Sequence, residues 1–268
     1  MRLMNIVLYP HPKINIGLSI VNRRPDGFHD IETLFYPVGN FKDVLEITES
    51  EVFSFNRYGN PYPLKDENPE NDLCVKAYRL LERDFNLPPV EIHLYKGIPV
   101  GAGIGGGSAD AACTLKALNR LFGLKLSQER LATYAAQLGS DCPFFIYDTP
   151  MIGRGRGEIL VPYNNETINS LKEDFSIKIV HPGIYISTAK AYSSVTPHPV
   201  ETPIEQLLEQ PVHQWKNTLT NDFEKPLFEE FPELRRIKEA LYDEGALYAS
   251  MSGSGSALFG LFRREYKK

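Results

Sequence analysis

The chain has 268 residues, of which 42% are hydrophobic and 24% are charged, enough to bury one large core or two closely packed ones. Its net charge of −5 argues against a protein that binds nucleic acid mainly through phosphate contacts. No run of about 18 apolar residues could span a membrane, and the N-terminus has no long apolar region. We therefore expect a cytoplasmic globular protein that has neither a nucleic-acid nor a membrane partner.

The first residues predict two strands, at positions 6–9 and 13–21. The second strand alternates polar and apolar residues. This places Lys13 and Asn15 on one face, because side chains two apart in a strand point the same way. On this pattern alone, a solvent-facing strand surface is the favoured interpretation.

A turn is expected at residues 22–27, where Pro is followed by Asp-Gly. Phe28 and His29 come directly after it, and such a pair usually serves packing and surface polarity. Residues 41–55 contain alternating strand patterns, and residues 56–71 are rich in Pro, Asn and charge, which predicts a loop.

A helix is predicted from residue 73, because apolar residues recur at helical spacing over positions 73–81 and Asn71-Asp72 can cap its start. Residues 90–96 then alternate as a strand and lead into a glycine-rich stretch. The three cysteines, Cys74, Cys113 and Cys142, are far apart and lack metal-ligand spacing, so we expect buried thiols in a reducing compartment.

Five glycines fall between positions 101 and 107, immediately before a helical pattern. Glycine accepts positive φ and lets backbone amides turn toward a ligand, and the first amides of a helix favour a negative charge. The stretch therefore predicts a phosphate-binding loop. A flexible linker is less favoured, because an apolar strand precedes the run and an amphipathic helix follows it.

Two common phosphate loops fit this stretch poorly. A P-loop requires a Lys after the glycines, and none is present. Gly101-x-Gly103-x-x-Gly106 matches the dinucleotide fingerprint, but Pro99 lies between strand and loop and no clear βαβ unit follows.

Two helices are predicted after the loop, over residues 108–122 and 127–139. Asp141 follows them. Taken alone, an Asp just before a Pro is more often a turn or N-cap carboxylate than a catalytic group.

The C-terminal half predicts a tight hairpin at residues 153–158, a polar loop at 163–175 and a strand at 177–180. A helix is expected over residues 232–243. Residues 249–259 form a Gly/Ser-rich loop with apolar strand patterns on both sides.

The stretch from Pro99 through Gly103, Gly105, Gly106 and Ser108 resembles the glycine-rich motif of the GHMP kinase superfamily, Pro-x-x-x-Gly-Leu-Gly-x-x-Ser-Ser-Ala. Ile replaces the usual Leu at position 104, and Ala replaces the second Ser at position 109. The hydroxyl role near the phosphates is therefore assigned to Ser108 alone.

Three further segments resemble the same superfamily. Pro-Lys-Ile-Asn at 12–15 with Arg-Pro-Asp-Gly-Phe-His at 24–29 is similar to the N-terminal signature of the branch that phosphorylates a cytidine diphosphate-linked methylerythritol. Residues 139–145, Gly-Ser-Asp-Cys-Pro-Phe-Phe, match the segment that carries its catalytic Asp, and residues 249–259 resemble its third motif. One departure is Asp72-Leu73, where the family has an Asn-Leu pair near the adenine.

The resemblance implies an α+β fold with two lobes. An S5-like N-terminal domain would cover residues 1–160 and carry the ATP-binding glycine loop. A ferredoxin-like C-terminal domain would cover residues 161–268.

The resemblance also implies transfer of the γ-phosphoryl group of ATP, with Mg²⁺, to a hydroxyl of the cytidine diphosphate-linked methylerythritol. Asp141 would accept the hydroxyl proton, and Lys13 would keep Asp141 ionised and help to neutralise the transferring group. The expected nucleotide-binding residues are Lys96, Pro99, Gly101, Gly103, Gly105, Gly106, Gly107 and Ser108. The expected substrate-binding residues are Asn15, Phe28, His29, Thr188 and Tyr192. No residue is assigned as a metal ligand.

Within that set, Phe28 and Tyr192 are expected to stack on the pyrimidine, and His29 is expected to read its polar edge. Two alternatives stay open. One is another GHMP kinase, acting on homoserine or a mevalonate derivative, and the other is a catalytically inactive GHMP-fold sensor.

Overall fold

The computed structural model describes residues 4–39, 41–59 and 68–264, and the chain divides into two compact units. Unit 1 comprises Met1–Pro12, Val38–Val100 and Gly105–Asp148. Unit 2 comprises Lys13–Pro37, Gly101–Ile104 and Thr149–Lys268. Each unit combines helices with strands, so the predicted α+β class is confirmed.

Unit 1 contains a four-stranded sheet in the order β1-β4-β6-β5, in which β5 runs parallel to β6 and the other pairs are antiparallel. Its strands are β1 (Asn5–Leu8), β4 (Val44–Glu49), β5 (Ser54–Gly59) and β6 (Val90–Lys96). Side chains alternate between the two faces of the sheet. Leu45, Ile47, Ile92 and Leu94 occupy the buried face.

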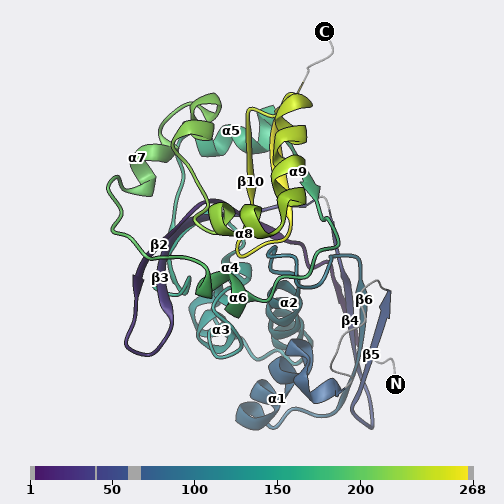
Figure 1. The fold of residues 1–268 in the computed structure, drawn as a ribbon. Helices are drawn as coiled ribbons and strands as arrows, with labels where there is room; N and C mark the ends of the chain where they lie inside the picture. The colour runs from purple at the N-terminus through teal and green to yellow at the C-terminus, as the bar shows by residue number, and fades with distance from the viewer. Residues whose placement is uncertain (1–3, 40, 60–67, 265–268) are drawn as a thin grey trace. The chain divides into compact units, whose positions relative to one another are not determined.

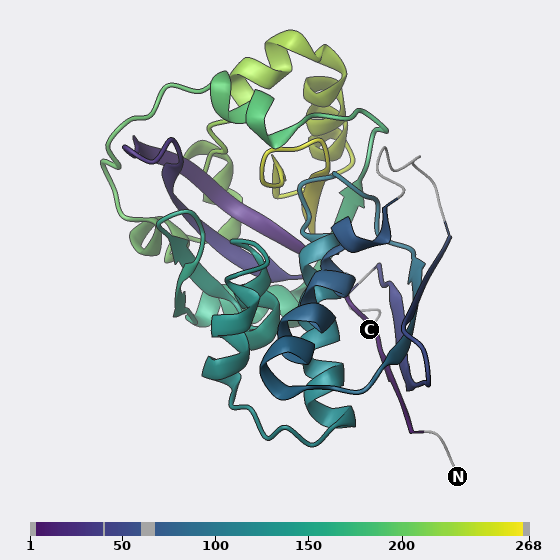
Figure 2. The ribbon, with the colours of Figure 1, turned by 90° about the horizontal axis from the view of Figure 1, so that it is seen from below.

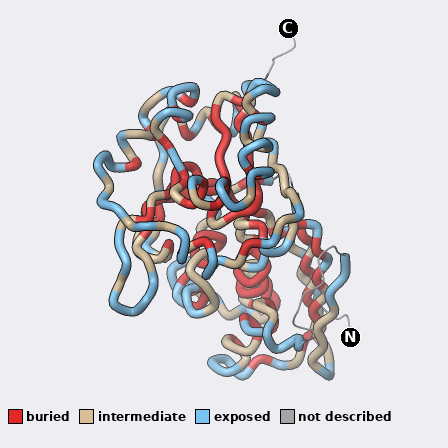
Figure 3. Tube along the Cα trace, viewed as in Figure 1, coloured by how far each residue is buried: buried red, intermediate tan, exposed pale blue. Residues whose placement is uncertain are grey.

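The helices of unit 1 are η1 (Pro69–Asn71), α1 (Leu73–Phe85), α2 (Gly106–Leu121), α3 (Gln128–Ala135) and α4 (Cys142–Tyr147). Figures 1 and 2 show α1 and α2 side by side next to the sheet, and Figure 3 shows how thoroughly α2 is buried. Two predicted starts are confirmed, since Asp72 caps α1 through the amide of Cys74 and Ser127 caps α3 through that of Arg130.

Unit 2 begins with the long hairpin of β2 (Lys13–Arg23) and β3 (His29–Pro37). These strands continue into an antiparallel sheet in the order β2-β3-β7-β8, with β7 (Met151–Arg154) and β8 (Ile159–Pro162). The predicted tight hairpin is therefore confirmed as the β7–β8 connection.

A second antiparallel sheet of unit 2 has the order β10-β11-β9. Its strands are β9 (Phe175–Val180), β10 (Tyr248–Met251) and β11 (Leu258–Arg263). The helices of this unit are α5 (Glu166–Asp174), α6 (Thr188–Ser193), α7 (Ile204–Leu208), η2 (Val212–Asn217), α8 (Glu224–Glu230) and α9 (Pro232–Asp243). Helix α9, predicted with the same bounds, packs against β10 and β11 (Figure 1).

The core of unit 2 joins segments from both ends of the chain. Leu18 and Ile20 from β2 and Ile31 from β3 pack in one cluster with Phe223 and Met251. The β2–β3 hairpin therefore shares its apolar core with the C-terminal half, while the domain boundary at residues 160/161 stays a prediction.

Two predicted loops are wrong. Residues 163–175 contain α5, because Asn165 caps the helix through the amide of Ile168, and Ile168 and Leu171 form a buried face. The predicted loop at 56–71 begins inside β5, which pairs with β6, and ends in η1; its residues 60–67 lie outside the described residues.

The three cysteines are free thiols, and Cys74 and Cys142 are buried as expected, whereas Cys113 is only half-buried. Within the described ranges, no helix combines the length and apolar character needed to cross a bilayer.

Candidate functional site

The glycine-rich stretch divides between the units, with Gly101–Ile104 in unit 2 and Gly105 onward in unit 1. Gly105 is the N-cap of α2 and has a φ of 73°, a left-handed conformation that glycine adopts without steric cost. It offers no side chain to cap the helix, so the first amides of α2 keep their capacity to bind a ligand. Together with the helix dipole, these amides suit an anion such as a phosphate group.

The two glycines that follow have different surroundings. A Cβ on Gly106 would lie 2.8 Å from Cγ2 of Ile98, so packing inside unit 1 excludes a side chain there. A Cβ on Gly107 would meet only Cδ1 of Leu73 at 3.8 Å, which is an ordinary contact. Gly107 is exposed, so its open side is the one that can face a ligand.

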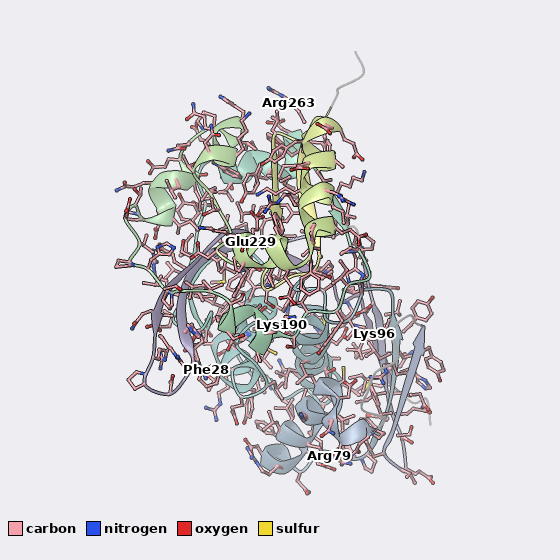
Figure 4. The ribbon with its side chains drawn as sticks, in the orientation of Figure 1. Phe28, Arg79, Lys96, Lys190, Glu229 and Arg263 are labelled. Atoms are coloured by element: carbon pink, nitrogen blue, oxygen red, sulfur yellow. The ribbon has the colours of Figure 1, made fainter. Side chains whose placement is uncertain are left out.

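Lys96 lies at the end of β6 (Figure 4) and is only 8% exposed. Its ammonium is paired with the carboxylate of Asp43 and, at 2.6 Å, with that of Asp110 in α2. Oδ1 of Asp43 accepts hydrogen bonds from the amides of Gly97 (2.6 Å) and Ile98 (2.7 Å). The cluster of Asp43, Lys96 and Asp110 therefore ties the end of β6 to α2. The predicted contact of Lys96 with the nucleotide stays a prediction.

Burial controls the charge of this cluster. Desolvation raises the pKa of Asp110 well above its ordinary value, and the charge of Asp43 raises it further against the opposing effect of Lys96. Burial alone would lower the pKa of Lys96, but the charges of Asp110 and Asp43 raise it overall. Oδ1 of Asp110 is buried and receives no hydrogen bond within the described part of the chain, so an ionised Asp110 would be poorly stabilised.

Asp141 is half-buried at the N-cap position of α4, but its side chain makes no capping hydrogen bond to this helix. The next residue, Cys142, is buried in α4, which packs against α2, and Ser108 of α2 partly opposes the effect of burial on the pKa of its thiol. Burial raises the pKa of Cys142 to about 12. Unit 1 thus brings the start of α4, which carries Asp141, close to Ser108 in the first turn of α2.

The first half of the glycine stretch lies against the C-terminal Gly/Ser loop in unit 2. A Cβ on Gly103 would lie 2.3 Å from the carbonyl oxygen of Ser252 and 2.8 Å from that of Gly255, so the two backbones touch. A Cβ on Gly101 would lie 3.3 Å from the ring of Tyr185. Pro99 is half-buried in the turn after β6.

Lys13 and Asn15 share one face of β2, as predicted, but that face is buried, with the two residues 3% and 1% exposed. The solvent-facing interpretation is therefore wrong. Nζ of Lys13 donates hydrogen bonds to Oδ1 of Asn15 (2.6 Å) and to the carbonyl of Gly103 (3.3 Å). Nδ2 of Asn15 donates to Oγ1 of Thr33 (3.1 Å), so both ends of the Asn15 amide have partners inside unit 2.

The aromatic residues predicted to bind the cytidine group fall in unit 2. Phe28 lies near the tip of the β2–β3 hairpin (Figure 4) and is 52% exposed, so it is not a core residue. The guanidinium of Arg156 lies 4.8 Å from the centroid of its ring. His29 stacks on Tyr192 with ring centroids 4.9 Å apart. Burial and the charge of Arg23 lower the pKa of His29, which keeps the imidazole neutral at pH 7.

Thr188, the remaining predicted substrate residue, is exposed at the start of α6 with its hydroxyl 3.5 Å from that of Ser254. Sequence reasoning missed Asp43, Asp110 and Asn221. Each is a buried polar residue. Only Asp110 could have been found from the sequence, because it is a charged residue on the apolar face of its helix.

Comparison with known proteins shows two matches to family domains. Residues 72–149 match the GHMP kinases N terminal domain, and residues 204–268 match the GHMP kinases C terminal domain. A curated relative from Bacteroides thetaiotaomicron, named 4-diphosphocytidyl-2-C-methyl-D-erythritol kinase, is 47% identical over 97% of this chain and 93% of its own length.

Solved structures agree with these matches. A crystal structure of 4-(cytidine 5'-diphospho)-2C-methyl-D-erythritol kinase has a TM-score of 0.77 and 34% identity, covering 96% of this chain and 90% of that one. A homoserine kinase from Cytophaga hutchinsonii has a TM-score of 0.67 at 19% identity, covering 94% and 84% of the two chains, which shows a shared fold alone.

Proposed function

This chain belongs to the GHMP kinases and, within them, to the 4-diphosphocytidyl-2-C-methyl-D-erythritol kinases, and we infer that it transfers the γ-phosphoryl group of ATP to the 2-hydroxyl of that substrate. The products are the 2-phosphate and ADP, in nonmevalonate isoprenoid precursor biosynthesis. The observation that carries this function is 47% identity over nearly the full length of a kinase with this name. The predicted domain boundary at 160/161 falls between the two matched ranges.

Phosphoryl transfer requires positioning and charge stabilisation more than covalent chemistry from the protein. We propose that the first-turn amides of α2, with Gly105, Gly107 and Ser108, hold the triphosphate of ATP. The support for this role is the uncapped N-terminus of α2 and the open side of Gly107.

Asp141 is proposed as the base that accepts the proton of the substrate hydroxyl. Its support is the agreement of residues 139–145 with the family segment, together with the place of Asp141 at the start of α4, which packs against α2. Lys13 is proposed to neutralise charge on the transferring group, and its buried ammonium is held in one direction by two acceptors.

Mg²⁺ is proposed as the accompanying cation, where it would neutralise charge on the phosphates. It prefers hard oxygen ligands and is commonly bound through one or two carboxylates plus phosphates and water. Unit 1 offers the carboxylate of Asp141 and the hydroxyl of Ser108, which fit that preference. No cluster of three or more His, Cys, Asp or Glu residues suited to a metal occurs among the described residues. The phosphates and water would supply most of its ligands.

The cytidine group is proposed to lie against Phe28 and Tyr192, with neutral His29 reading its polar edge and Thr188 and Asn15 nearby. The exposed ring of Phe28 and the His29–Tyr192 stack support this assignment. Among the described residues, no feature favours homoserine or mevalonate as the acceptor.

The test is product formation from labelled ATP with a panel of the cytidyl substrate, homoserine and mevalonate. Asp141→Asn should keep ATP binding and lower turnover of the cytidyl substrate about 100-fold or more, as loss of a general base does. Asp148→Asn, at the other end of α4, is the matched control and should leave turnover unchanged. Product from homoserine or mevalonate alone would overturn the substrate assignment, and near-normal turnover of Asp141→Asn would overturn the role of Asp141.

A further inference from the structure

Two groups that accept hydrogen bonds from the Lys13 ammonium, Asn15 and Gly103, are themselves joined by one buried hydroxyl. Ser252 is 1% exposed, and its Oγ accepts a hydrogen bond from the backbone amide of Asn15 (3.2 Å). The same hydroxyl donates to the carbonyl of Gly103 (3.1 Å). Asn15 and Gly103 each also accept a hydrogen bond from Lys13 Nζ, so Ser252 fixes the separation of these acceptors.

Ser252 is in turn fixed by Asn221, which is buried. Nδ2 of Asn221 donates to the carbonyls of Met251 (2.8 Å) and Gly253 (2.9 Å), the residues on either side of Ser252. Oδ1 of Asn221 accepts from the amide of Phe223 (3.0 Å). Both ends of this amide are therefore occupied, and the backbone around Ser252 is held on both sides.

The packing leaves little space for these groups to move independently. A Cβ on Gly253 would lie 2.8 Å from the carbonyl oxygen of Gly103 and 3.3 Å from Oδ1 of Asn15. The Gly/Ser loop and the glycine stretch are thus in backbone contact beside Lys13. A displacement of Ser252 would displace Gly103, and with it one acceptor of the ammonium.

We propose that Ser252 and Asn221 are positioning residues that set the direction of the Lys13 ammonium. A lysine ammonium is a point charge with three donors on a flexible stem, so holding two of its N–H bonds fixes the direction of the third. Asn221 acts through Ser252, and Ser252 acts through Gly103 and Asn15. The proposal rests on the proposed role of Lys13 in phosphoryl transfer.

Ser250 provides a control on the same strand. It is also fully buried, and its hydroxyl donates a hydrogen bond of similar length, 3.0 Å, to Oε1 of Glu224. The hydroxyl also lies 3.4 Å from the carbonyl of Met251, but neither bond involves Lys13, Asn15 or Gly103 in the described hydrogen-bond network. Removing the Ser250 hydroxyl tests the loss of a buried hydrogen bond without disturbing the acceptors of Lys13.

The experiment compares Ser252→Ala, Asn221→Ala and Ser250→Ala in the full chain, by kcat, both Michaelis constants and a melting curve. Ser252→Ala and Asn221→Ala should lower kcat about 10- to 100-fold, because a misplaced charge weakens transition-state stabilisation. Both Michaelis constants should stay within about threefold. Ser250→Ala should lose comparable thermal stability yet keep kcat within about twofold.

A double-variant cycle with Lys13→Met separates this inference from the function on which it rests. If Ser252 acts only through Lys13, Ser252→Ala should lower kcat no further in the Lys13→Met background. Normal turnover of Lys13→Met would overturn the proposed role of Lys13. Two outcomes would overturn the positioning role alone. One is a large loss of kcat in Lys13→Met together with wild-type kcat in folded Ser252→Ala. The other is a double variant whose loss of kcat is the full sum of the two single losses. Should Ser252→Ala fail to fold, the same cycle with Asn221→Ala decides between these outcomes.

Discussion

Gly106 and Gly107 are neighbours in the chain, but they are glycines for different physical reasons. At Gly106 an added side chain collides with Ile98 inside unit 1, whereas at Gly107 it makes only an ordinary contact with Leu73 next to the first turn of α2. The same substitution should therefore affect folding at one position and ligand binding at the other.

Gly107→Ala should keep or slightly raise stability, because Ala is favoured over Gly in a helix by up to about 1 kcal/mol. It should raise the Michaelis constant for ATP about tenfold if a phosphate approaches this side, a change of about 1.4 kcal/mol. Gly106→Ala should instead lower stability by about 1–3 kcal/mol through overpacking. Melting curves and ATP titrations of both variants check this. Unchanged ATP affinity in folded Gly107→Ala would place the phosphates elsewhere.

Phe28 offers a test of the substrate assignment, because its exposed ring can be removed without loss of core packing. Phe28→Ala should raise the Michaelis constant for the cytidyl substrate about tenfold, because stacking on a base contributes about 1–3 kcal/mol. The constant for ATP and the melting temperature should hardly change, since the ring is half-exposed.

Tyr95→Ala is the matched control, because Tyr95 is a similarly exposed aromatic ring in unit 1 that no prediction assigns to the site. An unchanged cytidyl-substrate constant in a stable Phe28→Ala variant would contradict the stacking role.

At the scale of single residues, the sequence could not predict contacts between residues that lie far apart in the chain. Strand periodicity showed that Lys13 and Asn15 share a face, but it could not show that this face is buried. Their partners Gly103 and Ser252 are 90 and 237 positions away, and no local pattern reports such contacts. The Lys96 cluster was missed for the same reason, since Asp43 lies 53 positions from Lys96.

At the scale of elements, the cluster of Asp43, Lys96 and Asp110 joins β6 to α2 at the two ends of the glycine-rich stretch. Asp43→Asn should destabilise the protein by about 3–5 kcal/mol, because it removes one partner of a buried ion pair. Asp110→Asn should destabilise the protein less than Asp43→Asn, because burial raises the pKa of Asp110 and so already disfavours its charged form. Chemical denaturation of both variants checks this contrast. Equal losses would contradict this contrast.

The raised pKa of Asp110 also gives a pH dependence with a defined sign. The folded protein retains a proton that the unfolded chain releases above its ordinary pKa of about 4. This contribution to stability is present at low pH and is lost as the pH rises toward the folded pKa. Asp110→Asn should therefore lose less stability than the wild type as the pH rises above about 4.

Elements with a capping residue or a clear period were predicted well, including α1, α2, α9, β2 and β6. Helix α5 was missed because only Ile168 and Leu171 mark its buried face within a polar segment. Strand β5 was cut short because its last residues are exposed and polar, and their pairing with β6 is a tertiary contact. Local sequence patterns predict helix caps and periodic elements, but strand pairing between distant segments can override the local preference.

At the scale of the whole molecule, neither compact unit is one continuous stretch of the sequence. Residues 161–268 expressed alone would lack Leu18, Ile20 and Ile31, which belong to the core cluster of unit 2. We expect this fragment to lack cooperative unfolding and a sharp near-UV circular dichroism spectrum. Joining residues 13–37 to residues 149–268 through a flexible linker should restore both properties. Cooperative unfolding of the 161–268 fragment alone would show that the predicted boundary delimits an autonomous domain.

The shared core of unit 2 also constrains how the chain acquires its structure during synthesis. Ile31 leaves the ribosome long before Met251 and Leu258, the residues with which it shares a core. Translation adds about 5–20 residues per second, so the apolar face of the β2–β3 hairpin stays uncovered for on the order of 10–45 s. Such late, non-local contacts slow folding and prolong exposure to aggregation. The nascent chain should therefore depend on chaperones until translation is almost complete.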